Sequence, residues 1–290
     1  MRLGVLFATF AAIGFSCKAI LIKLAYPYGI DALSLLVLRL GFSAPVFAVI
    51  AYTERRGRPP LVRRDAIGVA ALGLIGFYLS ALFDFAGLQY ISAGLERVIL
   101  FSYPTFVVLL SAVVLGKRPG RRELGAMALT YAGIAVSFGH DLGGTASGSS
   151  TWLGALFVLG SAISYSIYLV AGGQLIVRIG AARLMASSML WSALAVGVHF
   201  AAARPLAALV QPWQVYALAA AMAVFATILP SLMVGAAIAR IGSARFGLIG
   251  CIGPVATIFM AWLFLDEAVG VSQLAGAALV VGGVVVVSRK

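Results

Sequence analysis

Charged residues are scarce in this sequence, and this scarcity limits the class of protein that it can encode. Asp, Glu, Lys and Arg make up 10% of the 290 residues, and only nine of them are acids, whereas about 25% of a soluble domain is charged. Hydrophobic residues account for 62%, and the mean hydropathy is +1.08. A chain of this composition cannot cover a water-facing surface, so the sequence predicts an all-α membrane protein that lies almost wholly within a bilayer.

Metal ligands and cofactor motifs are also missing. The two cysteines, Cys17 and Cys251, lie inside apolar runs, where we expect them to act as small packing residues. His140 and His199 lie near the ends of such runs, without metal-ligand spacing. The sequence has neither an H-E-x-x-H motif nor a G-x-x-x-x-G-K-[ST] phosphate loop. We therefore expect no metal, no cofactor and no ATP-driven step, and we do not expect an enzyme.

Long apolar runs dominate what is present. A helix needs about 20 apolar residues to cross the hydrocarbon core. Runs of this kind can be placed at 3–25, 33–53, 67–89, 93–115, 123–139, 152–175, 183–203, 214–239, 244–265 and 270–288. The stretch Gly143–Thr151 is the only connection that resembles a linker. The sequence therefore predicts ten transmembrane helices, with residues 140–151 forming a periplasmic linker.

The basic residues indicate the orientation of these helices. A net charge of +12 could suit a nucleic-acid partner, but the basic residues are clustered in alternate connections, such as 55–64 and 117–122. If the N-terminus is cytoplasmic, nearly all of these clusters lie inside, while Asp31, Asp266 and Glu267 lie outside. We therefore expect a bacterial inner-membrane protein with both termini in the cytoplasm and no nucleic-acid partner.

The chain also matches itself at an offset of 150 residues. Identical pairs include Gly4/Gly154, Ser16/Ser166, Ile91/Ile241, Pro104/Pro254, Gly120/Gly270 and Gly133/Gly283. Each copy holds five predicted spans, and because five is odd, the second copy enters the membrane upside down. The sequence therefore predicts two inverted repeats, residues 1–139 and 152–290. This architecture is typical of secondary transporters that bind a small molecule near the midplane.

Several segments resemble a known family. Phe15-Ser-Cys-Lys-Ala-Ile-Leu-Ile-Lys-Leu-Ala25 is similar to the first-span motif of EamA-type transporters of the drug/metabolite transporter superfamily. The segments 88–95, 101–104 and 115–118 are also similar to segments of this family. The resemblance implies a ten-span transporter of amino acids, metabolites, drugs or sugar derivatives. Lys18 and Glu96-Arg97 depart from the motif, which has neutral or small residues at these positions.

Six ionisable residues lie within the predicted spans: Lys18, Lys23, Arg39, Asp84, Glu96 and Arg97. Each costs at least about 2.5 kcal/mol near the bilayer centre. Lys23 is expected to reach the outer interface. A rise of 1.5 Å per residue places the other five in one layer, roughly 5–10 Å below the outer end of their spans.

This charge layer has two interpretations. It could be a structural gate on the outer side, with Asp84 paired to Arg97, and Glu96 to Arg39 or Lys18. Alternatively, Lys18 is the surplus cation, without a partner, and binds an acidic group of the substrate. Asp84 or Glu96 could instead carry a coupling proton.

Further candidate residues lie in the same spans. Pro104 and Pro254 should kink their helices beside a cavity. Tyr165 and Tyr168 are the repeat partners of Phe15 and Lys18. With Tyr103, Ser102 and Ser161, these residues could contact a substrate, although aromatic residues at helical spacing commonly serve packing. The pairs Ala128-x-x-x-Ala132 and Ala278-x-x-x-Gly282 allow close helix contact or a dimer face.

The sequence thus favours a monomeric or homodimeric secondary transporter, an exporter of small polar or amphipathic metabolites that works by alternating access. Two alternatives remain open. One is an intramembrane enzyme or lipid-handling protein that uses Asp84 or Glu96, and the other is a channel.

Overall fold

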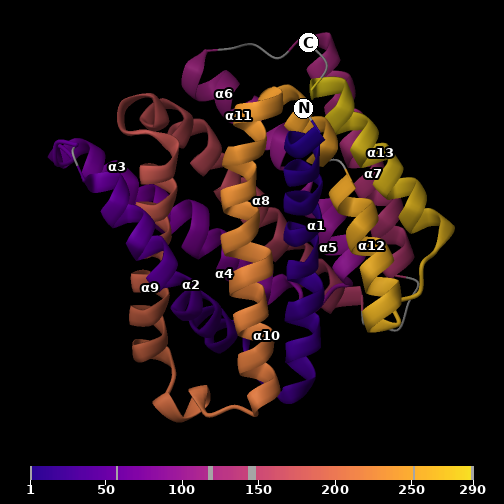
Figure 1. Cartoon of the computed structure of the whole chain (residues 1–290). Coiled ribbons are helices and arrows are strands. Elements are labelled where there is room, and N and C mark those ends of the chain that lie inside the picture. The colour runs from indigo at the N-terminus through magenta and orange to yellow at the C-terminus, as the bar shows by residue number, and fades with distance from the viewer. Residues whose placement is uncertain (1, 57, 117–119, 143–147, 251, 289–290) are drawn as a thin grey trace.

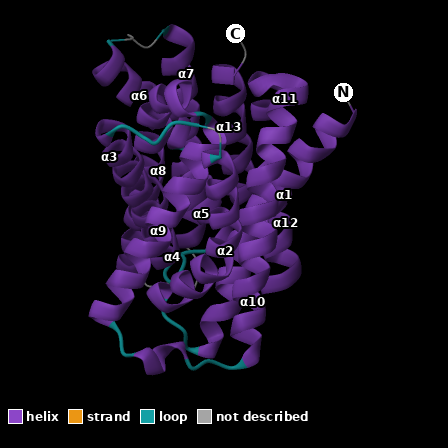
Figure 2. Ribbon diagram, turned by 60° about the vertical axis from the view of Figure 1, so that its left-hand side comes forward, coloured by secondary structure: helices purple, strands orange, loops and turns teal. Residues whose placement is uncertain are grey.

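The structure, a computed structural model, is a bundle of helices (Figure 1). It describes residues 2–56, 58–116, 120–142, 148–250 and 252–288, and within these ranges it contains no strand. Helix α1 begins, and α13 ends, at the same end of the bundle (Figures 1 and 2), and the loops gather at its two ends. A chain that starts and finishes at one end crosses the bundle an even number of times.

The helices follow the predicted apolar runs. The first half contains α1 (Arg2–Ala25), η1 (Tyr26–Tyr28), α2 (Ala32–Arg55), α3 (Arg63–Leu72), η2 (Gly73–Leu79), α4 (Ser80–Gly87), α5 (Ala93–Leu100), α6 (Tyr103–Leu115) and α7 (Arg121–Leu142). The second half contains α8 (Gly148–Ile179), α9 (Ala181–Ala203), η3 (Leu206–Leu209), α10 (Trp213–Ala223), η4 (Val224–Ile228), α11 (Leu229–Gly250), α12 (Ile252–Leu265) and α13 (Val271–Ser288). Seven helical segments of the described chain are long and apolar enough to cross a membrane, and two more apolar helices are shorter.

Some predicted features fall outside the described residues. These are Cys251, part of the basic cluster at 117–122, and the middle of the expected linker, 143–147. The ends of the linker are described and are helical, because α7 continues to Leu142 and α8 begins at Gly148.

Pro104 lies at the start of a helix, so the prediction that it kinks a continuous helix is wrong. The prediction for Pro254 is not tested, because residue 251 lies outside the described residues. Pro104 occupies the first turn of α6, and α5 has already ended at Leu100. Pro254 is the third residue of α12. Proline is well accommodated in a first turn, because its missing N–H would have no partner inside the helix. The span 93–115 is therefore interrupted rather than bent.

Hydrogen bonds recur at the 150-residue offset. The hydroxyl of Ser16 in α1 contacts the carbonyl oxygen of Gly253 in α12 at 3.0 Å. The hydroxyl of Ser166 in α8 contacts the carbonyl oxygen of Tyr103 in α6 at 2.9 Å. Both hydroxyls also reach the carbonyl four residues earlier in their own helix. Each member of the first contact lies 150 positions from a member of the second.

Helix geometry recurs in the same way. The π-helical turns η2 and η4 lie at Gly73–Leu79 and Val224–Ile228, which correspond under the offset. Gly4 allows Ile241 to approach so closely that an added Cβ would lie 2.6 Å from its Cγ2, and Gly154 does the same for Ile91 at 2.7 Å. The two halves therefore make equivalent contacts at equivalent positions.

Helices α7 and α13 pack closely through glycine. A Cβ on Gly133 would lie 2.5 Å from the carbonyl oxygen of Gly276, and one on Gly283 would lie 2.7 Å from that of Ala126. This contact uses a different face from the one predicted. The expected residues are either exposed or have open space beside them: Ala128, Ala132, Ala278 and Gly282.

Candidate functional site

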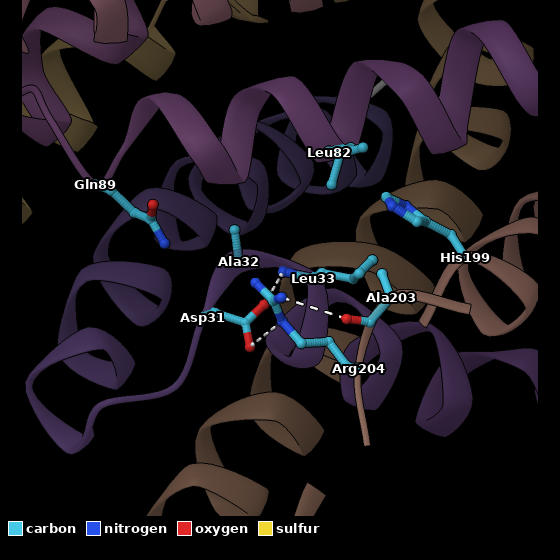
Figure 3. A pocket seen from close by; sticks show the side chains of 8 residues that line it. All are labelled: Asp31, Ala32, Leu33, Leu82, Gln89, His199, Ala203 and Arg204. Carbon is cyan, nitrogen blue, oxygen red and sulfur yellow. Dashed lines mark hydrogen bonds and ion pairs between the residues drawn. The ribbon is translucent and has the colours of Figure 1, made fainter. Parts of the chain in front are cut away.

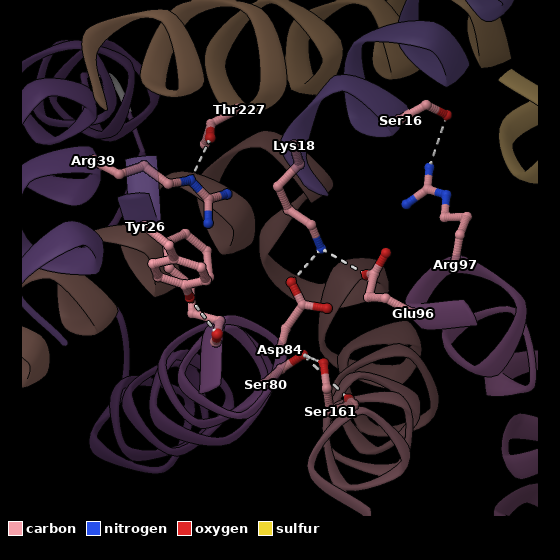
Figure 4. A network of polar contacts seen from close by, with 11 residues as sticks. Ser16, Lys18, Tyr26, Arg39, Ser80, Asp84, Glu96, Arg97, Ser161 and Thr227 are labelled. Atoms are coloured by element: carbon pink, nitrogen blue, oxygen red, sulfur yellow. Dashed lines mark hydrogen bonds and ion pairs between the residues drawn. The ribbon is translucent and has the colours of Figure 1, made fainter. Parts of the chain in front are cut away.

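A buried ion cluster joins three helices of the first half (Figure 4). Lys18 comes from α1, Asp84 from α4 and Glu96 from α5. The ammonium nitrogen of Lys18 lies 2.6 Å from Asp84 Oδ2 and 3.6 Å from Glu96 Oε1. The exposed fractions of the three side chains are 14%, 2% and 0%. The cluster therefore places one cation between two carboxylates at a depth where water screens little of their interaction.

This arrangement corrects two predicted partners. Lys18 is not the cation without a partner, because it contacts both carboxylates. Asp84 is paired with Lys18 rather than with Arg97, since the Arg97 guanidinium extends to Ser16 instead. Lys23, expected at the outer interface, lies 3.6 Å from Glu267 Oε1. The membership of the charge layer follows the depth prediction. Of the expected pairs, Glu96 with Lys18 is confirmed, and Asp84 with Arg97 is wrong.

The two arginines lie on opposite sides of the ion cluster (Figure 4) and have similar surroundings. Arg39 in α2 donates through Nε to Thr227 Oγ1 at 3.0 Å, and its guanidinium lies 5.4 Å from the Phe85 ring centre. Arg97 in α5 donates to Ser16 Oγ at 3.2 Å, and its guanidinium lies 5.3 Å from the Phe101 ring centre. Both are buried, with 8% and 6% exposed. Neither has a carboxylate oxygen within 4.0 Å in the described part of the chain.

Aromatic rings form a continuous row that begins beside Arg97. Phe101 and Tyr103 lie 6.2 Å apart between ring centres, Tyr103 and Tyr165 5.5 Å, and Tyr165 and Tyr168 6.2 Å. Tyr168 also meets Phe77 of η2 edge-on at 4.7 Å. This aromatic row runs from α6 of the first half to α8 of the second. It offers flat apolar faces with hydroxyl groups at their edges.

The other predicted contact residues are spread around this row. Ser102 lies at the break between α5 and α6, and its buried hydroxyl has no hydrogen-bond partner among the described residues. Ser161 is already occupied, because its hydroxyl lies 3.0 Å from that of Ser80. Phe15 is half-buried on α1. Within the described chain, no three His, Cys, Asp or Glu side chains gather as metal ligands.

Sequence reasoning missed a pocket of about 270 Å³ where α2, α4 and α9 approach each other (Figure 3). Asp31 lines it, caps the start of α2 through the amides of Leu33 and Ser34, and lies 3.5 Å from Arg204. Partial burial raises the pKa of Asp31, but hydrogen bonds from Ser34 and the nearby Arg204 outweigh burial and hold the pKa below its usual value. His199 lines the pocket too. The sequence signal for this pocket was a pair of opposite charges, Asp31 and Arg204, in two separate connections between apolar runs.

Comparison with known proteins agrees with this architecture. The model of the EamA-like transporter family matches residues 2–139 and 152–289. An uncharacterized transporter of Bacillus subtilis (strain 168), YcbK, is 33% identical over 94% of this chain and 88% of its own length. A probable terminal-alkyne amino-acid exporter of Streptantibioticus cattleyicolor is 28% identical over 91% of this chain and 85% of its own. One crystal structure matches with a TM-score of 0.69 at 19% identity, over 98% of this chain and 95% of that one.

The family match covers nearly the whole chain in two copies, and the resemblance expected from the first-span motif is thereby confirmed. This match describes a multi-pass membrane protein that moves a small molecule across the bilayer. The chain belongs to the EamA-like transporter family.

Proposed function

We propose that this transporter exports small polar or amphipathic metabolites, amino acids above all, across the bacterial inner membrane by alternating access. The relative from Streptantibioticus cattleyicolor, named as a probable amino-acid exporter, supports this substrate class. The aromatic row next to a buried cation supports it further, because an amphipathic molecule needs both an apolar face and a polar anchor.

The proposal includes ten spans in two inverted repeats, residues 1–139 and 152–290, joined by the linker 140–151, with both termini cytoplasmic. The hydrogen bonds that recur at the 150-residue offset support the repeat. The shared end at which α1 begins and α13 ends supports an even number of spans. Substrate would bind near the midplane between the halves, as in other inverted-repeat transporters.

The observation that carries the proposal is the meeting of the two halves beside the matched prolines, Pro104 and Pro254. Ser16 of the first half contacts the start of α12, and Ser166 of the second contacts the start of α6. The aromatic row crosses at the same place, because Tyr103 and Tyr165 belong to different halves. Residues at this crossing change neighbours when one half rocks against the other.

We assign roles to the predicted residues accordingly. Tyr103, Tyr165 and Tyr168 contact the substrate, with Ser102 and Phe15 beside them. The ion cluster of Lys18, Asp84 and Glu96 acts as a gate, because it fastens α1 to α4 and α5. Opening the outer side would separate these ions, and bound substrate would have to offset that cost.

Transport by purified protein in proteoliposomes tests the function. Radiolabelled amino acids, the corresponding amines and small organic acids are offered to vesicles with and without protein. The proposal predicts saturable, protein-dependent uptake of at least one amino acid. Ion conductance without any substrate would favour a channel instead, and turnover of an added lipid would favour a lipid-handling enzyme.

A further inference from the structure

We propose that Arg97 binds the carboxylate of the substrate, so that the transported molecule is an amphipathic organic acid such as an apolar α-amino acid. This inference rests on the proposed function. It assigns the anion-binding role to Arg97 instead of Lys18, and it begins from the charges of the buried layer.

The layer holds more positive than negative charge. Lys18, Arg39 and Arg97 face two acids, Asp84 and Glu96, and both acids have Lys18 as their nearest cation. Among the described residues, Arg39 and Arg97 are buried guanidinium groups that each have one hydroxyl and one ring as direct partners. A buried charge without an ionic partner is costly, and a substrate carboxylate beside one of these guanidinium groups would supply that partner.

Arg97 has donor capacity to spare. A guanidinium carries five N–H donors, and within the described part of the chain Arg97 uses them for one hydrogen bond, to Ser16 Oγ. The Nε atom of Arg97 is buried and has no hydrogen-bond partner among the described residues. The guanidinium also lies against the start of α12, since a Cβ on Gly253 would be 3.3 Å from one of its terminal nitrogens. A planar fork with free donors matches a carboxylate in two-point contact.

The second half indicates that packing does not require this cation. Ser166 makes the same two backbone contacts as Ser16, to a carbonyl in its own helix and to one at the start of the opposite broken span. The residue 150 positions after Arg97 is Gly247, which has no side chain. The serine contact therefore forms in both halves, although only the first half has an arginine at this position of the sequence. This arginine stands at the end of the aromatic row.

The aromatic row indicates the chemical character of the rest of the substrate. Arg97 lies over the ring of Phe101, and Phe101 is followed by Tyr103 and Tyr165. A molecule whose carboxylate meets Arg97 would lay its apolar part along these rings. Ser102 and Thr257, on the two flanking elements, have buried hydroxyls without hydrogen-bond partners among the described residues, and these hydroxyls could accept an ammonium group. An apolar α-amino acid satisfies all of these contacts.

Arg39 provides a matched control. Like Arg97, it is a buried guanidinium that donates to one hydroxyl and lies over one phenylalanine ring. It lies on the other side of the ion cluster from Arg97 (Figure 4). Its ring partner, Phe85, does not belong to the aromatic row. Loss of buried charge is common to Arg39→Gln and Arg97→Gln, but only the second removes the proposed carboxylate site.

The experiment compares acids with their amides. Thermal-shift titrations in detergent measure the affinities of L-leucine and L-leucinamide, and of L-phenylalanine and L-phenylalaninamide. A pH of about 6 keeps the ammonium group on every ligand. We expect the wild type to prefer an acid over its amide about 10- to 100-fold, as for charge-assisted hydrogen bonds. Arg97→Gln should reduce this preference to about twofold or less, whereas Arg39→Gln should retain it.

Three results would overturn the inference: no preference for either acid in the wild type, an unchanged preference in Arg97→Gln, or equal losses in both glutamine variants. Arg97→Lys is a second variant that keeps the test valid if Arg97→Gln does not fold. It keeps the positive charge but loses the planar pair of N–H donors, so it should retain only part of the preference for the acid. Uptake assays separate this inference from the proposed function. Binding with an Arg97-dependent preference but without transport would contradict the function alone, and transport without the preference would contradict the inference alone.

Discussion

Replacing Lys18 with methionine tests whether the ion cluster holds the first half together. Methionine keeps much of the length of the side chain but leaves two buried carboxylates without their nearest cation. With an effective dielectric constant of about 20, Coulomb attraction over 2.6 Å and 3.6 Å amounts to about 6 and about 5 kcal/mol. Desolvation offsets much of this. The net cost of breaking a buried pair is about 3–5 kcal/mol.

Such a loss should lower the midpoint of thermal unfolding in detergent by on the order of 10 °C. The double variant Lys18→Met/Asp84→Asn should recover part of the loss, because it removes the stranded carboxylate that lies nearest to the lysine. Lys23→Met is the control from the same helix. Its pair with Glu267 is about a quarter exposed and should contribute about 1 kcal/mol or less. Unfolding of Lys18→Met within about 2 °C of the wild type, or a double variant less stable than the single one, would refute this reasoning.

Three further predictions concern packing, capping and topology. Gly133→Ala should destabilise the protein by about 1–3 kcal/mol, because its Cβ would lie 2.5 Å from a carbonyl oxygen of α13; Gly282→Ala, with open space, should not, and similar melting curves for the two would contradict the packing. Asp31→Ala should cost about 1 kcal/mol at neutral pH. Because the folded pKa of Asp31 is lowered, this difference should fade as the pH falls below about 4, and a difference that persists in acid would be contrary to the capping role. Cysteines introduced at Gly57 and Ser147, two positions outside the described residues, should react with an impermeant reagent from opposite sides of a cysteine-free variant's membrane; same-side labelling would contradict the topology.

The sequence was sufficient to predict an all-helical membrane protein and the members of the charge layer. Bilayer thickness sets the length of an apolar run, and the rise per residue converts position into depth. Depth alone therefore brought Lys18, Arg39, Asp84, Glu96 and Arg97 together, and the structure places all five side chains in one region (Figure 4).

The pairing within that layer was predicted only in part: Glu96 with Lys18 was one of two expected partners, but Asp84 with Arg97 was wrong. Pairing depends on how each helix is rotated about its own axis. Successive residues are about 100° apart around a helix, so Glu96 and Arg97 point in different directions, and only Glu96 meets Lys18. The same limitation explains the error in α7, where Ala126 lies at the contact and Ala128, two residues on, is exposed.

The prolines illustrate a different limitation. Their identity at the 150-residue offset was visible, and so was their position in the middle of an apolar run. Whether a chain bends at Pro104 or begins a new helix there depends on the residues before it. In the structure α5 ends at Leu100, and the contact between Ser166 and Tyr103 occupies the backbone at the break. This tertiary contact involves a residue more than 60 positions away, which local patterns do not reveal.

Exchange across the membrane tests the central claim most directly. Proteoliposomes are loaded with an excess of unlabelled L-leucine or L-phenylalanine, or left empty, and the entry of the labelled amino acid is followed with no ion gradient. In a transporter that works by alternating access, the binding site turns back to the outside of the vesicle faster when it carries substrate than when it is empty. Unlabelled substrate inside the vesicle should therefore accelerate entry of the labelled amino acid and drive its transient accumulation above the external concentration. Entry at the same rate into loaded and empty vesicles, or accumulation that never exceeds the external concentration, would contradict the account.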